Sequence, residues 1–172
     1  MIPAATPDAP ASGPLLLTRR LGERAGGAAT LSLALTAEER TRLRGLRQSV
    51  CGCSLLLQLP RGEPLRPGEL LGGAAAEPLV RIEAALEPLL RVTAASELGL
   101  LQAAYHLGNR HVAMEIRAGE LRLLADPVLA QLLEHRGLSV TAVEAPFLPE
   151  AGAYAQAHAP THAHPHVHLH GH

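Results

Sequence analysis

The sequence predicts an α+β fold, and three features of the hydrophobic pattern along its 172 residues carry that prediction. Up to about residue 87, apolar residues occur in short runs separated by Gly and Pro clusters, which is typical of an all-β domain. From residue 88 to 150, strand-like and helix-like patterns alternate. Beyond residue 150 the apolar pattern stops and histidines accumulate. We therefore expect a disordered leader over residues 1–13, an all-β domain over 14–87, a mixed domain over 88–150 and a histidine-rich disordered tail over 151–172.

The first domain is expected to be a small barrel or sandwich. The leader holds Pro, Ala, Ser, Thr and Gly without periodicity. The predicted strands are residues 15–18, 31–35, 43–50, 55–57, 69–71 and 79–83. Cys51 and Cys53 flank Gly52 between two of these strands. They indicate a turn more readily than a metal site, although two thiolates could bind an ion if a third ligand lay near.

The second domain has the strand and helix order of a ferredoxin-like βαββαβ fold. Its predicted strands are residues 89–93, 112–117, 120–124 and 138–143. A second helix is well marked, because Asp126 is a suitable N-cap, Pro127 a suitable first helical residue and Gly137 a suitable terminator.

The first helix of this domain is predicted over residues 96–107. Leu98, Leu101 and Tyr105 share one of its stripes. Gly108 and Asn109 are expected to end the helix by adopting the left-handed conformation. His111 would then leave a helix and enter a strand.

The tail concentrates seven histidines in the last 15 residues, with no other ionisable side chain among them. Imidazole is a neutral donor that suits Zn, Cu and Ni, so an arm of this kind should bind metal. A purification tag is the alternative, but tags are normally continuous runs, whereas other residues interleave here. The candidate ligands are His158, His162, His164, His166, His168, His170 and His172.

His111 is the candidate for a positioned metal ligand, because a residue at a helix-to-strand junction can be held rigidly and still face solvent. One imidazole cannot hold a divalent ion against water. We therefore expect a homodimer whose twofold axis brings two copies of His111 together, with tail histidines completing the coordination. A hydrogen-bonded surface residue is the plainer alternative. His106 and His135, each in the last turn of a predicted helix, are interpreted as structural.

Composition excludes several classes of function. A net charge of −1 provides no basic field for nucleic acid. The longest uncharged apolar run near the start, residues 14–18, is far shorter than the roughly 20 residues that span a bilayer, so we expect no membrane partner and a cytoplasmic location. The three histidines outside the tail do not supply the fixed ligand set and carboxylate base of a zinc hydrolase. An enzyme is therefore not expected.

Four separated blocks carry a family resemblance: residues 35–42, 59–62, 105–129 and 146–154, with Tyr-His-Leu-Gly-Asn-Arg-His at 105–111 as the most specific part. In this order they resemble the urease accessory protein E family, the nickel metallochaperones. The resemblance implies a protein that collects Ni(II) and delivers it to the urease apoprotein complex and the urease accessory GTPase. It also implies that the first domain is a docking surface.

The resemblance further implies that His111, at the metal-binding position of the family motif, is a ligand. Some relatives carry two more histidines at the positions of Ala125 and Pro127, which this chain lacks. Zn(II) and Cu(II) are further ions that histidine sites accept. The alternatives are a histidine-rich zinc or nickel buffer or storage protein and, less favoured, a metal-dependent hydrolase using His106 and His111.

Overall fold

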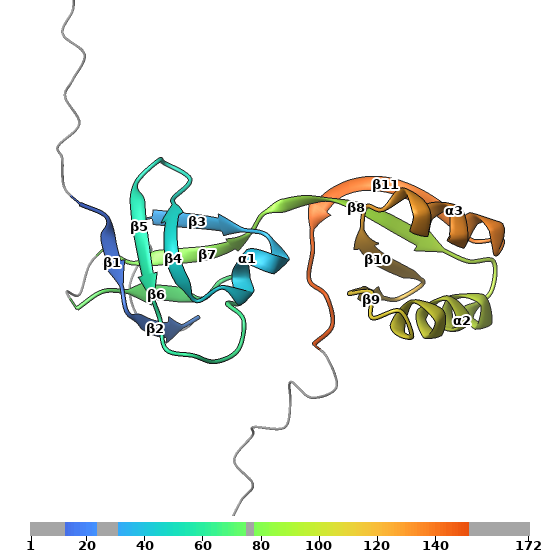
Figure 1. Ribbon diagram of the computed structural model, residues 1–172, viewed down its shortest axis with the longest axis horizontal. Helices are drawn as coiled ribbons and strands as arrows, with labels where there is room; N and C mark the ends of the chain where they lie inside the picture. The colour runs from blue at the N-terminus through green and yellow to red at the C-terminus, as the bar shows by residue number, and fades with distance from the viewer. Residues whose placement is uncertain (1–12, 24–30, 75–77, 152–172) are drawn as a thin grey trace, which may run out of the picture.

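The structure is a computed structural model that describes residues 13–23, 31–74 and 78–151. The predicted leader, apart from Gly13, and the tail histidines lie outside the described residues. Two lobes follow one another along the chain, a strand-rich N-terminal lobe and a C-terminal lobe with two longer helices (Figure 1). Within the described part of the chain, no helix is long and apolar enough to cross a membrane.

The N-terminal lobe consists of two sheets that share one apolar core. Their strands are β1 (Leu15–Leu17), β2 (Arg19–Gly22), β3 (Leu31–Leu35), β4 (Arg44–Gln48), β5 (Ser54–Gln58), β6 (Leu70–Gly72) and β7 (Val80–Ala84). The sheet orders are β1-β5-β4 and β2-β6-β7-β3. Alternate leucines on β1, β3 and β5, such as Leu17, Leu33 and Leu55, are at most 1% exposed and pack in the same cluster. The period-two pattern read from the sequence therefore identifies the buried face.

The prediction that this lobe is entirely β was wrong, because a short helix, α1 (Ala37–Thr41), follows β3. A capping box begins it: the Glu39 amide donates to the Thr36 hydroxyl, and the Thr36 amide donates to the Glu39 carboxylate. This reciprocal pair satisfies two amides that helix geometry leaves without partners. Thr36-Ala37-Glu38-Glu39 was the signal in the sequence. The strand β2 was also missed.

The Cys51-Gly52-Cys53 segment lies in the turn between β4 and β5, as predicted. The Ser49 amide donates to the Cys53 carbonyl at 2.9 Å, and the Cys53 amide donates to the Ser49 hydroxyl at 2.9 Å. Gly52 has φ +89°, which a glycine adopts without strain. Hydrogen bonds from Ser49 and from Cys53 lower the pKa of the Cys51 thiol.

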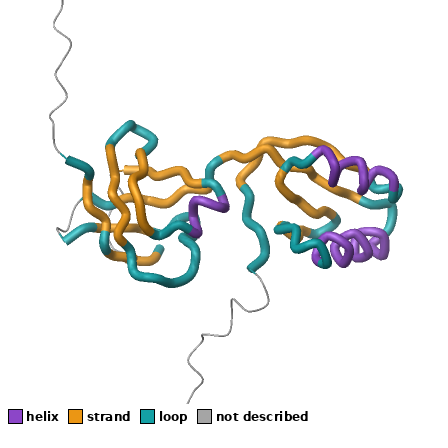
Figure 2. The backbone as a smooth tube through the Cα atoms, viewed as in Figure 1, coloured by secondary structure: helices purple, strands orange, loops and turns teal. Residues whose placement is uncertain are grey.

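The C-terminal lobe has the predicted βαββαβ order. Its elements are β8 (Leu86–Thr93), α2 (Glu97–Gly108), β9 (Glu115–Arg117), β10 (Glu120–Leu124), α3 (Pro127–His135) and β11 (Ser139–Pro146). All neighbours in the sheet order β11-β8-β10-β9 are antiparallel. The two helices pack on the sheet through a cluster that includes Leu107, Leu121 and Leu133. Figure 2 shows both helices in this lobe.

Two details of this lobe differ from the prediction. The strand expected over residues 112–117 is confined to β9, because only Glu115, Ile116 and Arg117 pair with β10. On α2, the stripe of Leu98, Leu101 and Tyr105 lies away from the core, with exposed fractions of 63%, 67% and 67%. The buried face of α2 instead carries Ala103 and Leu107.

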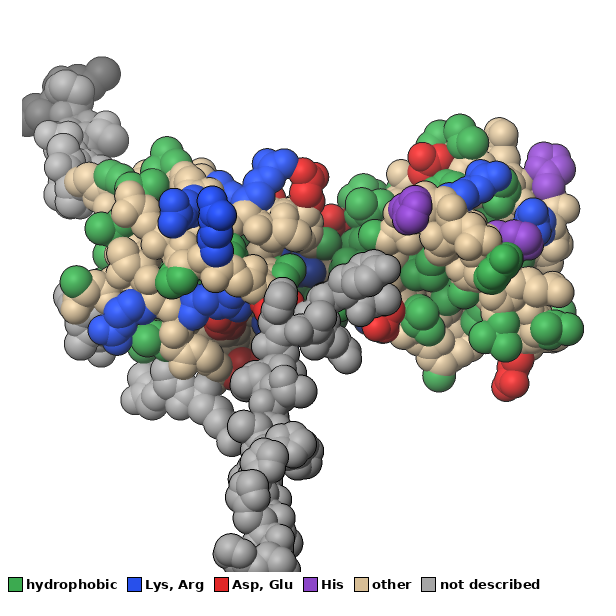
Figure 3. Space-filling view, turned by 60° about the horizontal axis from the view of Figure 1, so that its bottom comes forward, with side chains coloured by type: hydrophobic (Ala, Val, Ile, Leu, Met, Phe, Trp, Pro, Cys, Tyr) green, Lys and Arg blue, Asp and Glu red, His purple; other side chains and the backbone are tan. Residues whose placement is uncertain are grey.

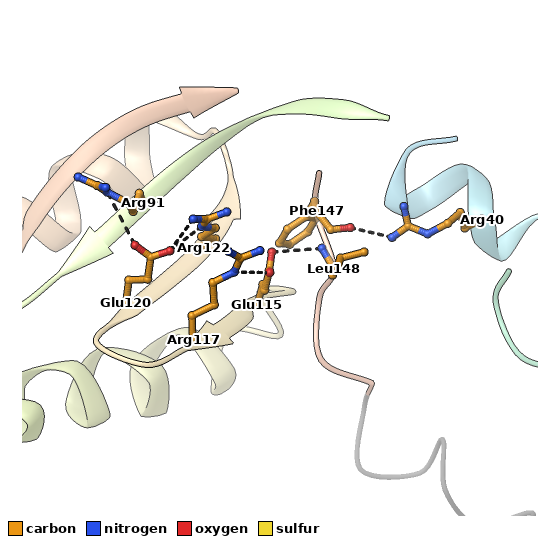
Figure 4. A network of polar contacts seen from close by, with 8 residues as sticks. All are labelled: Arg40, Arg91, Glu115, Arg117, Glu120, Arg122, Phe147 and Leu148. Atoms are coloured by element: carbon orange, nitrogen blue, oxygen red, sulfur yellow. Dashed lines mark hydrogen bonds and ion pairs between the residues drawn. The ribbon is translucent and has the colours of Figure 1, made fainter. Parts of the chain in front are cut away.

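Polar contacts join the two lobes. Arg40 of α1, 5% exposed, donates to the Leu35 carbonyl and, at 2.7 Å, to the Phe147 carbonyl beyond β11. Glu87 of β8 accepts from the Ala37 amide at 2.8 Å. Burial lowers the pKa of Arg40, and the charge of Glu87 acts in the opposite direction. The segment after β11 is thereby attached to the N-terminal lobe (Figure 4).

Candidate metal centre

His111 lies at the end of α2 in a Schellman motif. The Val112 amide donates to the Leu107 carbonyl at 3.1 Å, and the His111 amide donates to the Gly108 carbonyl at 2.9 Å. In this motif the left-handed residue is the one whose amide makes the shorter-range of the two hydrogen bonds. That residue is His111, with φ 56°, the one non-glycine residue of the described part that has positive φ. Gly108 and Asn109 were both predicted to be left-handed, and that prediction was wrong: Gly108 is the last residue of α2 and has no positive φ, and Asn109 has φ −62°.

The other helix of the lobe ends in the same way with the usual residue. The Leu138 amide donates to the Leu133 carbonyl at 3.1 Å, and the Gly137 amide donates to the Glu134 carbonyl at 2.9 Å. Gly137 has φ +79°. His111 therefore occupies a position where its sister helix has glycine, in a conformation that costs an L-residue roughly 1–2 kcal/mol.

The His111 side chain is exposed, and no hydrogen bond or ion pair engages its imidazole within residues 13–23, 31–74 and 78–151. The plainer alternative, a hydrogen-bonded surface histidine, requires such a bond. Val112, directly after it, packs against the apolar core of the lobe. The backbone is thus anchored on both sides of an imidazole that remains accessible.

The other two histidines of the lobe are placed differently. His135 shares a 2.7 Å hydrogen bond between its Nδ1 and the Gln131 carbonyl one turn earlier, which fits the helix-end role predicted for it. His106 is half-buried, and its ring lies edge-on to Tyr105 with centroids 5.5 Å apart. Figure 3 shows the histidines of the described chain on the C-terminal lobe. The structure does not bring the three together, since no metal-holding group of three His, Cys, Asp or Glu occurs among the described residues.

The origin of the tail lies close to His111. The Glu150 amide donates to the Met114 carbonyl at 2.8 Å. The Leu148 amide donates to a carboxylate oxygen of Glu115 at 3.3 Å, and Arg117 donates to the other oxygen at 2.6 Å (Figure 4). Ala151 is the last described residue. It directly follows Glu150, whose amide is hydrogen-bonded to Met114, three residues after His111 in the chain.

Glu115, the buried carboxylate that holds this segment, was not among the predicted site residues. Its signal was an acidic residue at a strand position next to buried Met114. A second signal was Phe147, the one phenylalanine in the chain, between Pro146 and Pro149. A large apolar residue in a proline-flanked segment indicates a docked terminus, and Phe147 is 1% exposed.

Comparison with known proteins places both lobes in one family. The model of the UreE urease accessory protein, N-terminal domain, matches residues 17–85, and that of the C-terminal domain matches residues 87–172. The chain is 56% identical over 149 residues to the urease accessory protein UreE of Synechococcus sp. strain WH7805, covering 79% of each chain.

Two further relatives extend the comparison. The chain is 54% identical over 141 residues to the urease accessory protein UreE of Parasynechococcus marenigrum, covering 82% of this chain and 93% of that protein. With the urease accessory protein UreE of Pseudomonas putida strain W619 it shares 43% identity over 143 residues, 83% of this chain and 88% of that protein. Because these matches span both lobes, the chain belongs to the UreE urease accessory protein family.

Proposed function

We propose that this chain collects Ni(II) on His111 of two copies and on histidines of its tail, and then releases it to urease during maturation. Membership of the UreE family makes the chain a nickel metallochaperone of urease maturation and not an enzyme. The observation that supports the role of His111 is its left-handed backbone at an exposed helix end, with no bond to its ring in the described chain. Strain that glycine would relieve is a mark of function, since evolution usually removes it.

A second copy of the chain supplies the second imidazole in this proposal. One histidine provides one donor, whereas Ni(II) binds several. Leu98, Leu101 and Tyr105 form an apolar stripe on α2 that leads toward His111, and Leu101 lines a groove with Ile116 of β9. Exposed apolar patches of this kind mark interaction sites. We infer that a twofold copy covers this stripe with the axis passing near the C-terminal end of α2, an arrangement that would bring the two copies of His111 together.

Tail histidines complete the coordination in this proposal. The hydrogen bond from Glu150 to Met114 starts the tail beside the His111 segment, which raises the local concentration of imidazole there. An incompletely enclosed site made of histidines combines useful affinity with lability. A carrier needs both properties, because the ion must leave for a partner that offers more ligands.

The remaining features fit the same role. We infer that the βαββαβ lobe is a ferredoxin-like platform for the metal and that the N-terminal lobe is a small sandwich that docks on the urease apoprotein or the urease accessory GTPase. We place the protein in the cytoplasm, where urease maturation would use it. Zn(II) and Cu(II) should also bind, since imidazole accepts all three ions.

Nickel titration and mass measurement test the proposal in a chain that ends at residue 151. This form should bind one tight Ni(II) per dimer. His111→Ala should abolish that ion while the fold and the dimer persist, and His135→Ala should leave it unchanged because its Nδ1 is bonded within α3. A tight ion that survives His111→Ala would overturn the assignment.

The same measurement separates the chaperone from a storage protein. If the chain merely buffers metal, removal of residues 152–172 eliminates nearly all bound nickel. If the proposal is right, the ion shared by the dimer remains. The hypothesis of a metal-dependent hydrolase is excluded if the nickel-loaded chain does not hydrolyse esters, amides or phosphate esters.

A further inference from the structure

The turn between β4 and β5 presents two thiols side by side. Cys51 Sγ and Cys53 Sγ are 3.5 Å apart, and Cys51 Sγ is 3.2 Å from the Ser49 hydroxyl oxygen. Both cysteines are free and exposed. This turn projects from the N-terminal lobe, the lobe that does not carry His111 (Figure 1).

The turn itself explains only part of this arrangement. Gly52 is required by its φ of +89°, and Ser49 is required because its hydroxyl accepts the Cys53 amide. Neither thiol is needed to close the turn, and neither is buried in the core. Ser49 nevertheless fixes the backbone of Cys53 and contacts the Cys51 thiol, so the turn presents both thiols on the same side and within contact of each other. The pair is a preorganised dithiol.

We propose that Cys51 and Cys53 form a two-thiolate binding site for a soft monovalent metal ion of the Cu(I) class. Thiolates select soft ions such as Cu(I), whereas the histidines of the C-terminal lobe are borderline donors suited to Ni(II). Cu(I) is satisfied by two sulfur ligands, so the pair needs no third donor. A tetrahedral zinc site would need two more.

The binding step requires no electron transfer. Each thiol releases its proton to solvent as it coordinates, and the resulting bis-thiolate complex of Cu(I) carries one negative charge. A linear S–Cu–S arrangement requires the sulfurs to separate beyond 3.5 Å. Rotation about the side-chain bonds of the two cysteines can supply this separation, because both side chains are exposed.

With such a site, the N-terminal lobe would offer thiolate ligands and the C-terminal lobe imidazole ligands. Imidazole also accepts copper, so Cu(I) present together with nickel is a competitor at a histidine site. A thiolate pair in the other lobe would take copper in its soft oxidation state and leave the imidazoles to nickel. This inference does not depend on how His111 binds nickel.

The test is a competition for Cu(I) between the full-length chain and a colourimetric Cu(I) chelator under anaerobic, reducing conditions. The wild-type chain should withdraw one Cu(I) per chain from the chelator and show thiolate-to-copper charge-transfer absorption. Cys51→Ser and Cys53→Ser should each lose that absorption and weaken Cu(I) binding at least about 100-fold, because the second thiolate acts at high effective concentration.

Two controls make the result decisive. A chain with the seven tail histidines replaced by Ser should retain the tight Cu(I), and Ni(II) binding should be the same in Cys51→Ser as in the wild type. Alkylation of the wild-type thiols with iodoacetamide provides a second form in case a serine variant folds poorly. Equal Cu(I) binding by the Cys51→Ser/Cys53→Ser double variant, or failure of the wild type to compete, would refute the site without affecting the nickel proposal.

Discussion

His111 occupies a backbone position that favours glycine, and the same lobe contains its own reference. At the end of α3, Gly137 makes the equivalent pair of hydrogen bonds at a similar φ. The chain therefore accepts strain at one of two equivalent helix ends, and it does so where the side chain is an accessible imidazole. If His111 binds metal as proposed, this residue exchanges stability for function, a compromise that is common at active and binding sites.

A reciprocal pair of substitutions measures that strain. His111→Gly should raise the free energy of unfolding by about 1 kcal/mol, because glycine adopts the left-handed conformation without cost, and it should remove nickel binding at the same time. Gly137→His should lower the free energy of unfolding by about 1–2 kcal/mol, since the space around Gly137 is open and only the backbone resists. Urea denaturation of the metal-free chains measures both. Equal stability of all three chains would show that His111 is not strained.

Nickel binding should weaken as the pH falls. An ordinary imidazole titrates near about pH 6.5, and only its neutral form coordinates. Each histidine ligand should therefore reduce the apparent affinity by about tenfold per pH unit below that value, so that most of the binding is lost between roughly pH 7 and 5. Isothermal titration in two buffers of different ionisation enthalpy would also count the protons released. Full affinity near pH 5 would instead indicate carboxylate or thiolate ligands.

At the scale of elements, α1 connects the lobes although it has only five residues. Its Arg40 donates to the carbonyl that ends β3 and to the Phe147 carbonyl after β11. In addition, β8 and β11 pair over their whole lengths, from Leu86 with Pro146 to Thr93 with Ser139. The segment that leads to the tail is therefore determined jointly by both lobes.

Replacing Arg40 by Met should uncouple this connection. The substitution leaves the Phe147 carbonyl without its buried donor and should lower the free energy of unfolding by about 3 kcal/mol. Arg42→Met, at the C-cap of the same helix, is the matched control, because its ion pair with Glu38 is exposed and should contribute less than about 1 kcal/mol. Calorimetry should show separate transitions of the two lobes in Arg40→Met only. A single unchanged transition would mean that Arg40 does not connect them.

At the scale of the whole molecule, the proposed dimer depends on the exposed stripe of α2. Leu101→Glu should raise the dissociation constant of the dimer by about 100-fold or more, because it places like charges opposite each other near the twofold axis. The tight nickel ion should be lost with the dimer. Val128→Glu is the control, since Val128 of α3 is 69% exposed and Leu101 67%. Analytical ultracentrifugation measures the oligomeric state of both variants. If the Leu101→Glu chain is still a dimer, this face of α2 is not the dimer interface.

The tail should act through its composition. If residues 158–172 behave as the disordered arm predicted from the sequence, a scrambled version that keeps all seven histidines should preserve nickel capacity and urease activation in cells at limiting nickel. Replacement of the seven by Ser should lower capacity and leave activation at ample nickel largely intact. A scrambled tail that fails as badly as the Ser tail would show that individual positions are ligands.

Much of the fold could be predicted locally. Alternation along β3 and β10, the Asp126-Pro127 start of α3 and the Gly137 end of the same helix rest on patterns within a few residues. Prediction was wrong where a tertiary contact overrides the local pattern. Glu115 is buried because Arg117 and the Leu148 amide satisfy its carboxylate, and no pattern around residue 115 contains the second partner.

The sequence by itself determined the order of elements in the C-terminal lobe, the family and the supply of imidazoles, because each depends on residue types and short spacings. The tertiary structure decided which leucines of α2 are buried, since helix periodicity defines a stripe but not its partner. It also decided that His111, not Asn109, is the left-handed residue, because packing of Val112 on the core sets where the helix turns away. The start of the tail beside Met114 depends likewise on a contact between residues far apart in the chain.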